Sequence, residues 1–316
     1  MDDWKVTVRQ MHKNRRGARK IAERVGKTID EIRIFIKSDE FTQPTDPNKT
    51  EKFTIFENLT PETQVQEWSG NQILTFGLIG DTHINSNYTQ LTYLKEFYEI
   101  CSRKGITNIY HTGDIDEGEQ MRVGHQYECY TQGGDVHVSE IVANYPRVDG
   151  IETHFITGNH DASIYKRCGI DIGRNISEKR DDMKYLGRDC ARIEITPNCI
   201  LELRHPWDGT AYALSYKPQK MIEGMEADSK PNILAIGHYH KIEYLFYRNV
   251  HCFQTGCFQT QTPFTRGRGI SVHLGGWIIT VEVDKKGHVQ RIIPEMIPFY
   301  KGIDHDYQKW SRNSNG

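Results

Sequence analysis

Three short stretches of this sequence concentrate side chains that bind metal ions, and each begins directly after a glycine. They are Asp81-Thr82-His83, Asn159-His160-Asp161 and His238-Tyr239-His240, and two further residues, Asp114 after Gly113 and His205, are of the same types. Imidazole accepts borderline metals such as Zn, Fe, Ni or Mn, while carboxylates accept harder ions. A carboxylate that lies between two cations can also bridge them. These residue types suit a site for two divalent cations.

Each of these residues follows a segment that reads as a β-strand. The segments are Ile73–Ile79, Thr107–His111, Glu152–Thr157, Ile200–Arg204 and Asn232–Ile236. In open α/β sheets the carboxyl ends of the strands converge on the ligand crevice. We therefore expect residues far apart in the sequence to meet at one end of the fold.

The intervening segments complete an α/β pattern. Apolar residues at helical spacing predict helices over Thr89–Arg103, over a stretch that reaches Tyr145, and over Tyr212–Met225. The chain after 240 is rich in strand patterns, which predicts a sheet layered with further strands. We expect the glycines that precede the polar clusters to let the backbone turn sharply at each strand end.

The order of these motifs resembles that of a known superfamily. D-x-H, G-D, G-N-H-D, a single His and G-H-x-H follow one another between residues 73 and 250. In this order they resemble the calcineurin-like metallophosphoesterases. The resemblance implies a two-sheet β-sandwich flanked by helices. It also implies two divalent metal ions, with Mn as the first expectation and Fe, Zn, Ni or Mg as alternatives.

The resemblance also implies a role for each residue. Asp81, His83 and His240 would hold the first metal, Asn159, His205 and His238 the second, and Asp114 would bridge them. A hydroxide between the two metals would attack the phosphate. His160 would meet the substrate, where it would protonate the leaving oxygen or stabilise the charge of the transition state. Asp161 would orient His160 by a hydrogen bond to its other ring nitrogen.

One departure from the family bears on the substrate. Many members continue as G-D-x-x-D-R, whereas this chain continues as Gly113-Asp114-Ile115-Asp116-Glu117-Gly118. The arginine that would grip a phosphomonoester is missing at that place. This difference argues against a protein phosphatase.

The first 37 residues differ in charge from the rest of the chain. They hold eleven Lys and Arg against five Asp and Glu, a net charge of +6, while the whole chain carries −2. The remainder is therefore at about −8. A basic segment on an acidic body suggests a polyanionic partner, and a solvated helical surface is the alternative.

Residues 18–37 resemble a helix-turn-helix. Ile21, Ala22 and Val25 would face inward, Gly26 lies at the turn, and Thr28 with Glu31 forms a capping box. Because the second helix of such motifs enters the major groove, we expect DNA contacts from the following residues. They are Lys27, Thr28, Arg33 and Lys37. A three-helix bundle that docks another protein is the alternative.

A second basic segment lies near the end of the chain. Arg266 and Arg268 stand in Thr265–Gly269, where they could reach a substrate phosphate, and a plain β-turn is the alternative.

The sequence thus divides into a helix-turn-helix-like segment (1–37), a polar linker (38–70), a metallophosphoesterase domain (71–300) and a C-terminal tail (301–316). Seven cysteines without a C-x-x-C pair argue against a disulfide framework. The first residues lack the apolar stretch of a secretory signal, and no run reaches the roughly 20 apolar residues of a membrane span. We expect a cytoplasmic protein without a membrane partner, and a homo-oligomer is compatible with the sequence.

Three functions follow from these patterns. The first is a two-metal phosphodiesterase that acts on DNA, as a nuclease or end-processing enzyme; the nuclease subunit of double-strand-break repair complexes shares this core, although here the core begins only after about 70 residues. The second is a phosphatase or a phosphodiesterase of small molecules such as cyclic nucleotides. The third is a DNA-binding protein with a relic metal fold, which the full set of metal-binding residues disfavours.

Overall fold

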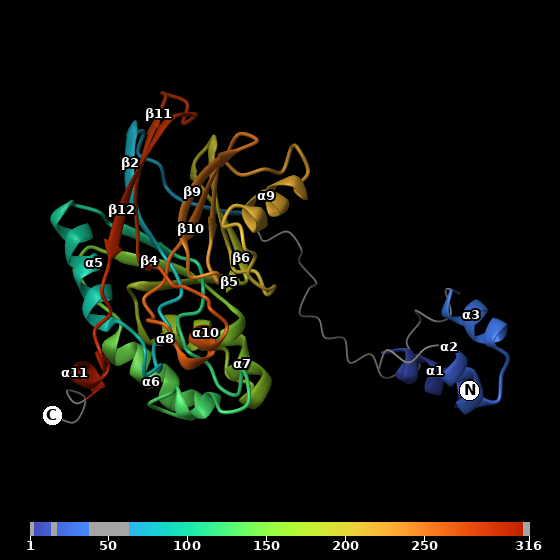
Figure 1. Ribbon diagram of the computed structural model, residues 1–316. Coiled ribbons are helices and arrows are strands. Elements are labelled where there is room, and N and C mark those ends of the chain that lie inside the picture. Colours follow the sequence, from blue (N-terminus) through green and yellow to red (C-terminus); the bar gives the residue numbers. More distant parts are fainter. Residues whose placement is uncertain (1–2, 14–17, 38–62, 312–316) are drawn as a thin grey trace. The chain divides into compact units, whose positions relative to one another are not determined.

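The computed structural model describes residues 3–13, 18–37 and 63–311 (Figure 1). The chain divides into two units, Met1–Thr60 and Pro61–Gly316. Most of the predicted linker, residues 38–62, and the end of the predicted tail, residues 312–316, lie outside the described residues. None of the described helices is long and apolar enough to cross a membrane.

The N-terminal unit contains three helices: α1 (Asp3–Lys13), α2 (Ala18–Val25) and α3 (Ile29–Ile36). Their buried core consists of Val8, Ile21, Ala22, Ile32 and Phe35. Gly26 ends α2 with a φ of +66°, a conformation that glycine adopts without a Cβ clash. Thr28 caps α3, and the reciprocal hydrogen bonds with Glu31 form the predicted capping box.

The larger unit is built on two sheets of six strands each. In the first sheet, β2, β3, β4 and β5 run parallel, while β11 and β12 add to the β2 edge in antiparallel pairing. Its strands in spatial order are β12 (Val289–Phe299), β11 (Leu274–Val283), β2 (Ile73–Ile79), β3 (Asn108–His111), β4 (Glu152–Thr157) and β5 (Met183–Arg188).

The second sheet is also mixed. The pairs β1–β6, β7–β8 and β8–β10 are parallel, and the pairs β6–β7 and β9–β10 are antiparallel. Its strands in spatial order are β1 (Thr63–Val65), β6 (Cys190–Thr196), β7 (Cys199–Arg204), β8 (Ile233–Ile236), β10 (Val250–Thr255) and β9 (Ile242–Tyr247).

The two sheets pack face to face, and helices cover their outer faces (Figure 1). Alternate residues of one strand serve different layers: Ile109 and Phe155 pack toward the helices, whereas Tyr110 and Ile156 pack between the sheets. The first sheet is covered by α5 (Leu91–Arg103), α6 (Gly134–Asn144), α7 (Asn159–Cys168) and α8 (Ile172–Lys179), and the second by α9 (Tyr216–Glu223). This arrangement confirms the predicted fold class, an α/β two-sheet sandwich flanked by helices.

Three segments differ from their predicted structure. Thr63–Val65, expected in the linker, pairs with β6 as an edge strand. The helical stretch that reaches Tyr145 begins only at Gly134, and residues 112–133 form a long loop with one 3₁₀ turn, η1 (His125–Tyr127). In the expected tail, the buried carboxylate of Asp306 accepts a hydrogen bond from the Thr92 backbone N at 2.7 Å, which ties the segment before α11 (Gln308–Ser311) to the start of α5.

Candidate metal centre

The carboxyl ends of five strands from both sheets bring the predicted residues together. In the first sheet β2, β3 and β4 are parallel neighbours, and they lead into Asp81, Asp114 and Asn159. In the second sheet the parallel pair β7 and β8 leads into His205 and into the His238–His240 turn. Because the two sheets face each other, these five strand ends meet at one edge of the sandwich.

Asp81, His83 and His240 form the first group, and their potential ligand atoms all lie within 4.8 Å of one another. The Nε2 atoms of His83 and His240 are 3.0 Å apart, and His240 Nε2 lies 3.4 Å from Asp81 Oδ1. A neutral imidazole carries one lone pair, so the two facing nitrogens and the carboxylate converge on a place that suits a cation.

Asp114, His205 and His238 form the second group. His205 Nε2 lies 3.1 Å from Asp114 Oδ2 and 3.0 Å from the amide oxygen of Asn159. Asp114 Oδ2 is also 3.9 Å from His83 Nε2 in the first group. Asp114 therefore stands between the two groups, as a bridging carboxylate would.

Hydrogen bonds fix which ring nitrogen turns toward each group. His205 Nδ1 donates to the Thr112 carbonyl at 2.8 Å, which leaves Nε2 as the nitrogen that faces Asp114 and Asn159. His238 Nε2 donates to the Asp208 carbonyl at 2.6 Å, which leaves Nδ1. Metal-binding histidines commonly donate their other N–H to a carbonyl or carboxylate in this way.

The charge of the site also fits metal cations. Asp81, Asp114 and Glu117 are each at most 1% exposed. In the described part of the chain their ion pairs involve histidines only, with no Lys or Arg among them. A buried carboxylate needs a compensating charge, and two divalent cations would supply it here.

The histidines carry part of that charge when no metal is bound. Burial lowers the pKa of His205, but the Asp114 carboxylate outweighs it and raises the pKa to about 9. Burial lowers the pKa of His238 to about 4, so this ring is neutral and ready to bind a metal at neutral pH. Burial likewise lowers the pKa of His111 to about 3, and this neutral ring contacts the Thr82 hydroxyl at 3.1 Å.

The backbone at the site is strained. Asp81, His83, Asp114, His238 and His240 have φ values of 51°, 45°, 55°, 76° and 54°. Residues other than glycine rarely adopt this left-handed conformation, which costs on the order of 1 kcal/mol or more each. Such strain persists where the surrounding fold imposes it, and it clusters at functional sites.

The glycines before the polar clusters act differently from the prediction. Only Gly113 of the four has a positive φ, at 96°. At Gly158 a Cβ would lie 2.4 Å from Asp114 Oδ1 and 2.6 Å from the ring of His205. The absence of a side chain, rather than a sharp turn, explains glycine at this position, because the metal-binding side chains occupy the space.

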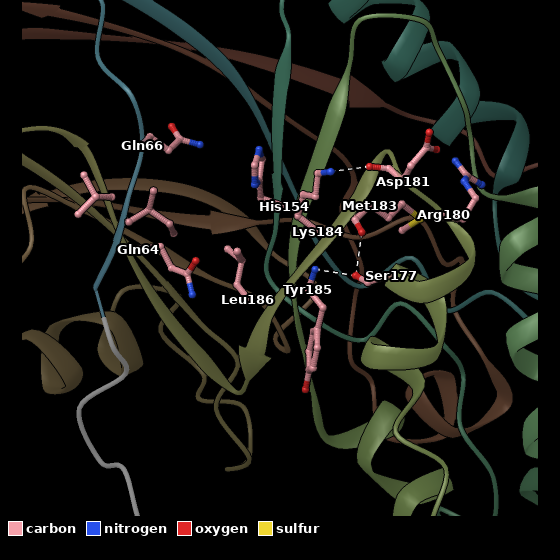
Figure 2. Close-up of a pocket in the computed structure, with 12 residues that line it drawn as sticks. Gln64, Gln66, His154, Ser177, Arg180, Asp181, Met183, Lys184, Tyr185 and Leu186 are labelled. Atoms are coloured by element: carbon pink, nitrogen blue, oxygen red, sulfur yellow. Dashed lines mark hydrogen bonds between the residues drawn. The ribbon is translucent and has the colours of Figure 1, made fainter.

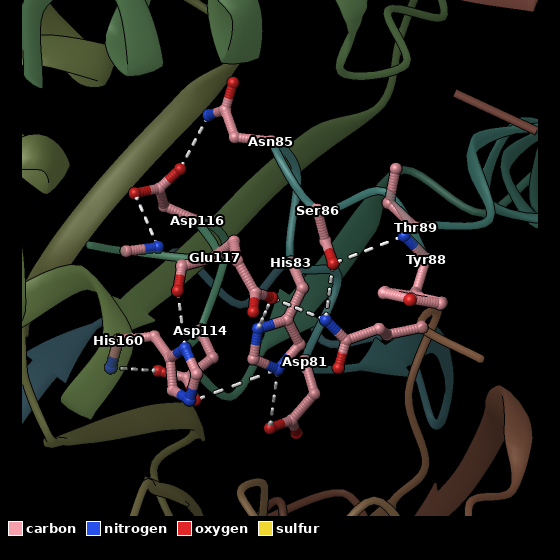
Figure 3. Close-up of polar contacts among 12 residues, drawn as sticks. Asp81, His83, Asn85, Ser86, Tyr88, Thr89, Asp114, Asp116, Glu117 and His160 are labelled. Atoms are coloured by element: carbon pink, nitrogen blue, oxygen red, sulfur yellow. Dashed lines mark hydrogen bonds and ion pairs between the residues drawn. The ribbon is translucent and has the colours of Figure 1, made fainter. Parts of the chain in front are cut away.

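Glu117 belongs to the site although the sequence did not single it out. Its Oε2 lies 3.1 Å from His83 Nδ1 (Figure 3), and its Oε1 lies 2.8 Å from His125 Nε2. Its main-chain carbonyl accepts a hydrogen bond from His160 Nδ1 at 2.5 Å. Burial raises the pKa of Glu117, but the hydrogen bond with His125 and the close His83 ring hold it well below the ordinary value. Glu117 thus positions two histidines at once.

The role predicted for Asp161 was wrong. Its carboxylate does not orient His160 but accepts hydrogen bonds from the backbone N of Gly158 at 2.8 Å and of Asp116 at 2.9 Å. Asp161 is the third residue of α7, from which a side chain reaches back to the helix start. Asp161 therefore ties the loop after β4 to the loop after β3. The role of orienting the His160 ring, which was predicted for Asp161, falls to the Glu117 carbonyl.

A cavity of about 300 Å³ opens onto both metal-binding groups. His83, Asp114, Asn159, His160, His238 and His240 line it, together with Arg122, Phe264 and Arg268. Residues 263–267 form a short helix, α10 (Pro263–Gly267), instead of a β-turn. Arg268 follows this helix and lines the cavity, whereas Arg266 does not. The structure thus separates the two arginines that the sequence treated as a pair.

A larger cavity, of about 480 Å³, lies between the edge strands β1 and β5 (Figure 2). Its lining contains His154, Arg180 and Lys184 but none of the residues of the two metal-binding groups. Ser177 in its wall bonds to the backbone of Met183 and Tyr185. The lining of this larger cavity contains none of the groups of converging ligand atoms, so we place the candidate functional site in the cavity of about 300 Å³.

The residues predicted to contact DNA lie on the N-terminal unit. Lys27 Nζ is 3.3 Å from Glu31 Oε1 and stands over the Trp4 ring, and Arg33 is 3.8 Å from Asp30. Thr28 is used as the helix cap and Lys37 ends α3. The side chains of Arg33 and Lys27 are 66% and 36% exposed, so both remain accessible to a partner.

Comparisons with known proteins give weak similarities only. No protein-family model matches this chain, and no curated protein matches it. Among solved structures, an archaeal phosphodiesterase is 14% identical over 71% of this chain and 100% of its own, with a TM-score of 0.40. Zinc-bound Vps29 from Entamoeba histolytica (15%; 71% and 99%; 0.36) and a predicted phosphoesterase from Streptococcus pneumoniae (12%; 72% and 98%; 0.33) are comparable. We therefore derive the function from the side chains of this chain.

Proposed function

We propose that this protein is a metal-dependent phosphodiesterase that acts on DNA. The observation that carries the proposal is the pair of metal-binding groups joined by Asp114, whose Oδ2 is 3.1 Å from His205 Nε2 and 3.9 Å from His83 Nε2. Asp81, His83 and His240 would hold one divalent ion, Asn159, His205 and His238 the other, and Asp114 both. Two such ions, when bound, supply Lewis acidity and an activated water for phosphoester hydrolysis.

The protein's own contribution centres on His160. Its backbone N–H donates to Asp114 Oδ1 at 2.9 Å, and its Nδ1 donates to the Glu117 carbonyl. The first bond fixes the backbone and the second fixes the ring, so Nε2 is the nitrogen left to exchange a proton with a substrate oxygen. Burial lowers the pKa of His160 below its ordinary value, which makes the protonated ring a stronger proton donor toward a leaving oxygen. His160 is the residue that we assign to the leaving oxygen.

Two features support DNA as the substrate. The cavity carries two arginines beside the metal-binding groups, which suits an anionic polymer. The N-terminal unit holds basic side chains at the start and end of α3, and residues 1–37 carry a net charge of +6. In this proposal the N-terminal unit binds duplex DNA through Lys27, Thr28, Arg33 and Lys37.

A small phosphoester is the second candidate substrate. The cavity of about 300 Å³ has the size of a small-ligand site. In that case the enzyme is a phosphatase or a small-molecule phosphodiesterase, and the N-terminal unit serves only to locate it.

One panel of assays tests both candidates. The full chain is stripped with EDTA, reloaded with Mn²⁺, Fe²⁺, Zn²⁺, Ni²⁺ or Mg²⁺, and offered single-stranded DNA, duplex DNA, bis-p-nitrophenyl phosphate and p-nitrophenyl phosphate. We expect cleavage of both the diester and DNA, with Mn²⁺ the first ion to test, and its loss in Asp114→Asn. Cleavage of the monoester alone would select the phosphatase, and inactivity with every ion and substrate would reject both.

The role of the N-terminal unit has a separate test. Binding of the full chain to duplex DNA should weaken as salt rises, and Arg33→Gln should reduce its salt dependence. Lys285→Gln, which changes an exposed cation of the larger unit, serves as the control. Binding that ignores salt, or that responds equally to both variants, would contradict a DNA-binding role for this unit.

A further inference from the structure

Two arginines from distant parts of the chain meet on one aromatic ring at the edge of the metal-site cavity. The guanidinium carbons of Arg122 and Arg268 lie 4.4 Å and 4.6 Å from the centre of the Phe264 ring. Both distances are within the range of cation–π attraction. All three side chains line the cavity that also contains His83, Asp114 and His160.

The base of this arrangement is fixed by hydrogen bonds. Thr262, 3% exposed, caps α10 by accepting from the Thr265 backbone N at 3.3 Å. Gln261 Nε2 donates to the Ile270 carbonyl at 2.7 Å, which closes the segment that carries Phe264 and Arg268. The ring and the arginine are therefore held before any substrate arrives, which lowers the entropic cost of binding.

The two arginines differ in how much of their charge is already used. Arg122 forms an ion pair with Glu128. Within residues 63–311, Arg268 forms no ion pair with a carboxylate, and its side chain is exposed. Its guanidinium can therefore accept an anion from outside, and a guanidinium binds a phosphate through two parallel N–H···O bonds.

The two arginines differ in charge from the other charged side chains that line the cavity. The remaining charged side chains in its lining are Asp114, Glu117 and Asp208, all acidic. Metal cations would neutralise Asp114 and would also bind the phosphate that is cleaved. That phosphate therefore does not need the arginines. Arg268 is then available for a different anion, with the Arg122 guanidinium beside it on the Phe264 ring.

We propose that Arg122 and Arg268, held against Phe264, bind the phosphate next to the one that is cleaved. This inference rests on the proposed function and names its substrate class: a chain with at least two phosphodiester groups, such as an oligonucleotide. The ring positions the two guanidinium groups and does not stack on a base, because they already lie against it.

The test compares a substrate with neighbouring phosphates to one without. Oligothymidylate has them, while bis-p-nitrophenyl phosphate has a single phosphodiester. We expect Arg268→Gln to lower kcat/KM for the oligonucleotide by about 10–100-fold, mainly through KM, since a hydrogen-bonded charge contributes a factor of this order. The loss on bis-p-nitrophenyl phosphate should be at least tenfold smaller. Arg268→Lys, which keeps the charge without the two-pronged donor, should fall between Arg268→Gln and the parent.

Arg266→Gln is the matched control, because Arg266 stands on α10, two residues before Arg268, and does not line the cavity. It should leave the ratio of the two activities unchanged, and Phe264→Leu, which removes the ring that positions both cations, should shift the ratio in the same direction as Arg268→Gln. Equal losses on both substrates in Arg268→Gln, or no loss on either, would overturn the inference. A parent protein that cleaves neither substrate would instead refute the proposed function.

Discussion

The replacement Glu117→Gln tests how the protein orients its metal-binding histidines. The carboxylate contacts the rings of His125, through Nε2 at 2.8 Å, and of His83, whose Nδ1 lies 3.1 Å away, and it accepts a hydrogen bond from the Gln259 amide. Both carboxylate oxygens are in use, and the residue is 1% exposed. A glutamine keeps the shape but offers one oxygen and one NH₂ group, so one end of the side chain must present a donor to a donor.

The expected size of the effect follows from these contacts. Glu117 is ionised, and a hydrogen bond to a charged group contributes about 1.5–3 kcal/mol. Residues that orient a metal-binding histidine in this way commonly change metal affinity by roughly 10–100-fold. We therefore expect Glu117→Gln to weaken binding of the first metal by about 10–100-fold, or about 1.4–2.8 kcal/mol.

Titration calorimetry with Mn²⁺ on the EDTA-stripped full chain measures this loss directly. The matched control is Glu202→Gln, which changes another buried glutamate, also 1% exposed, that contacts Arg192 and Arg204 and lies in neither metal-binding group. The control should lose stability but keep its metal affinity. If Glu117→Gln binds Mn²⁺ as tightly as the parent, the carboxylate does not orient His83 in the way that we describe.

Three further predictions concern metal binding, the loops and the N-terminal unit. Because the metal-free pKa of His205 is about 9, a proton must leave as the metal binds, so Mn²⁺ affinity should rise as the pH increases from 6 to 9, with proton release visible in buffers of different ionisation enthalpy; an affinity independent of pH would contradict this. Asp161→Ala, which leaves three buried backbone N–H groups without their acceptor, should lower the free energy of unfolding by about 2–4 kcal/mol in urea. A loss below about 0.5 kcal/mol, the size of an ordinary surface change, would contradict this role. Thr28→Ala removes the cap of α3 and should cost about 1 kcal/mol, seen as faster amide hydrogen exchange in α3 with unchanged exchange in the sheets; equal exchange in α3 would show that the cap is dispensable.

The structure brings the proposed metal ligands together as the sequence predicted, because each of them follows the end of a strand. The position of Asp81 after β2 and of Asp114 after β3 depends only on local strand ends and on parallel pairing. Both are readable from apolar runs and glycines. The two-sheet architecture followed from the same pattern together with the family resemblance.

The residues around these groups could not be predicted in the same way. Glu117 reaches His83 and His125 because residues 112–133 fold as a long loop, which the pattern assigned in part to a helix. Asp161 and His160 are adjacent in sequence, which suggested a contact, but the helix directs their side chains to different partners. Contacts of this kind depend on how loops from different strands pack together, and a single sequence carries no periodic signal for that.

The short edge strand and the C-terminal segment could not be predicted from the sequence either. All three residues of β1 are exposed, so no alternation of apolar and polar residues identifies Thr63–Val65 as a strand. The C-terminal segment is held by the buried Asp306 and by Trp310, over whose ring Lys95 stands at 3.1 Å. Asp306 is polar and is buried only because of its distant partner Thr92, so the sequence around it predicted an exposed tail.

The left-handed backbone at five of the proposed metal ligands decides which variants can report on chemistry at all. Aspartate and asparagine adopt this conformation more readily than most residues, because their short polar side chains can form local hydrogen bonds. Alanine lacks such a side chain. An alanine at Asp81 or Asp114 would therefore disturb the loop as well as remove an oxygen, and a loss of turnover would have two causes that no kinetic experiment separates. Asparagine preserves the loop geometry. Substitutions of aspartate by asparagine therefore report on the lost carboxylate alone, whereas alanine substitutions would change the loop conformation as well.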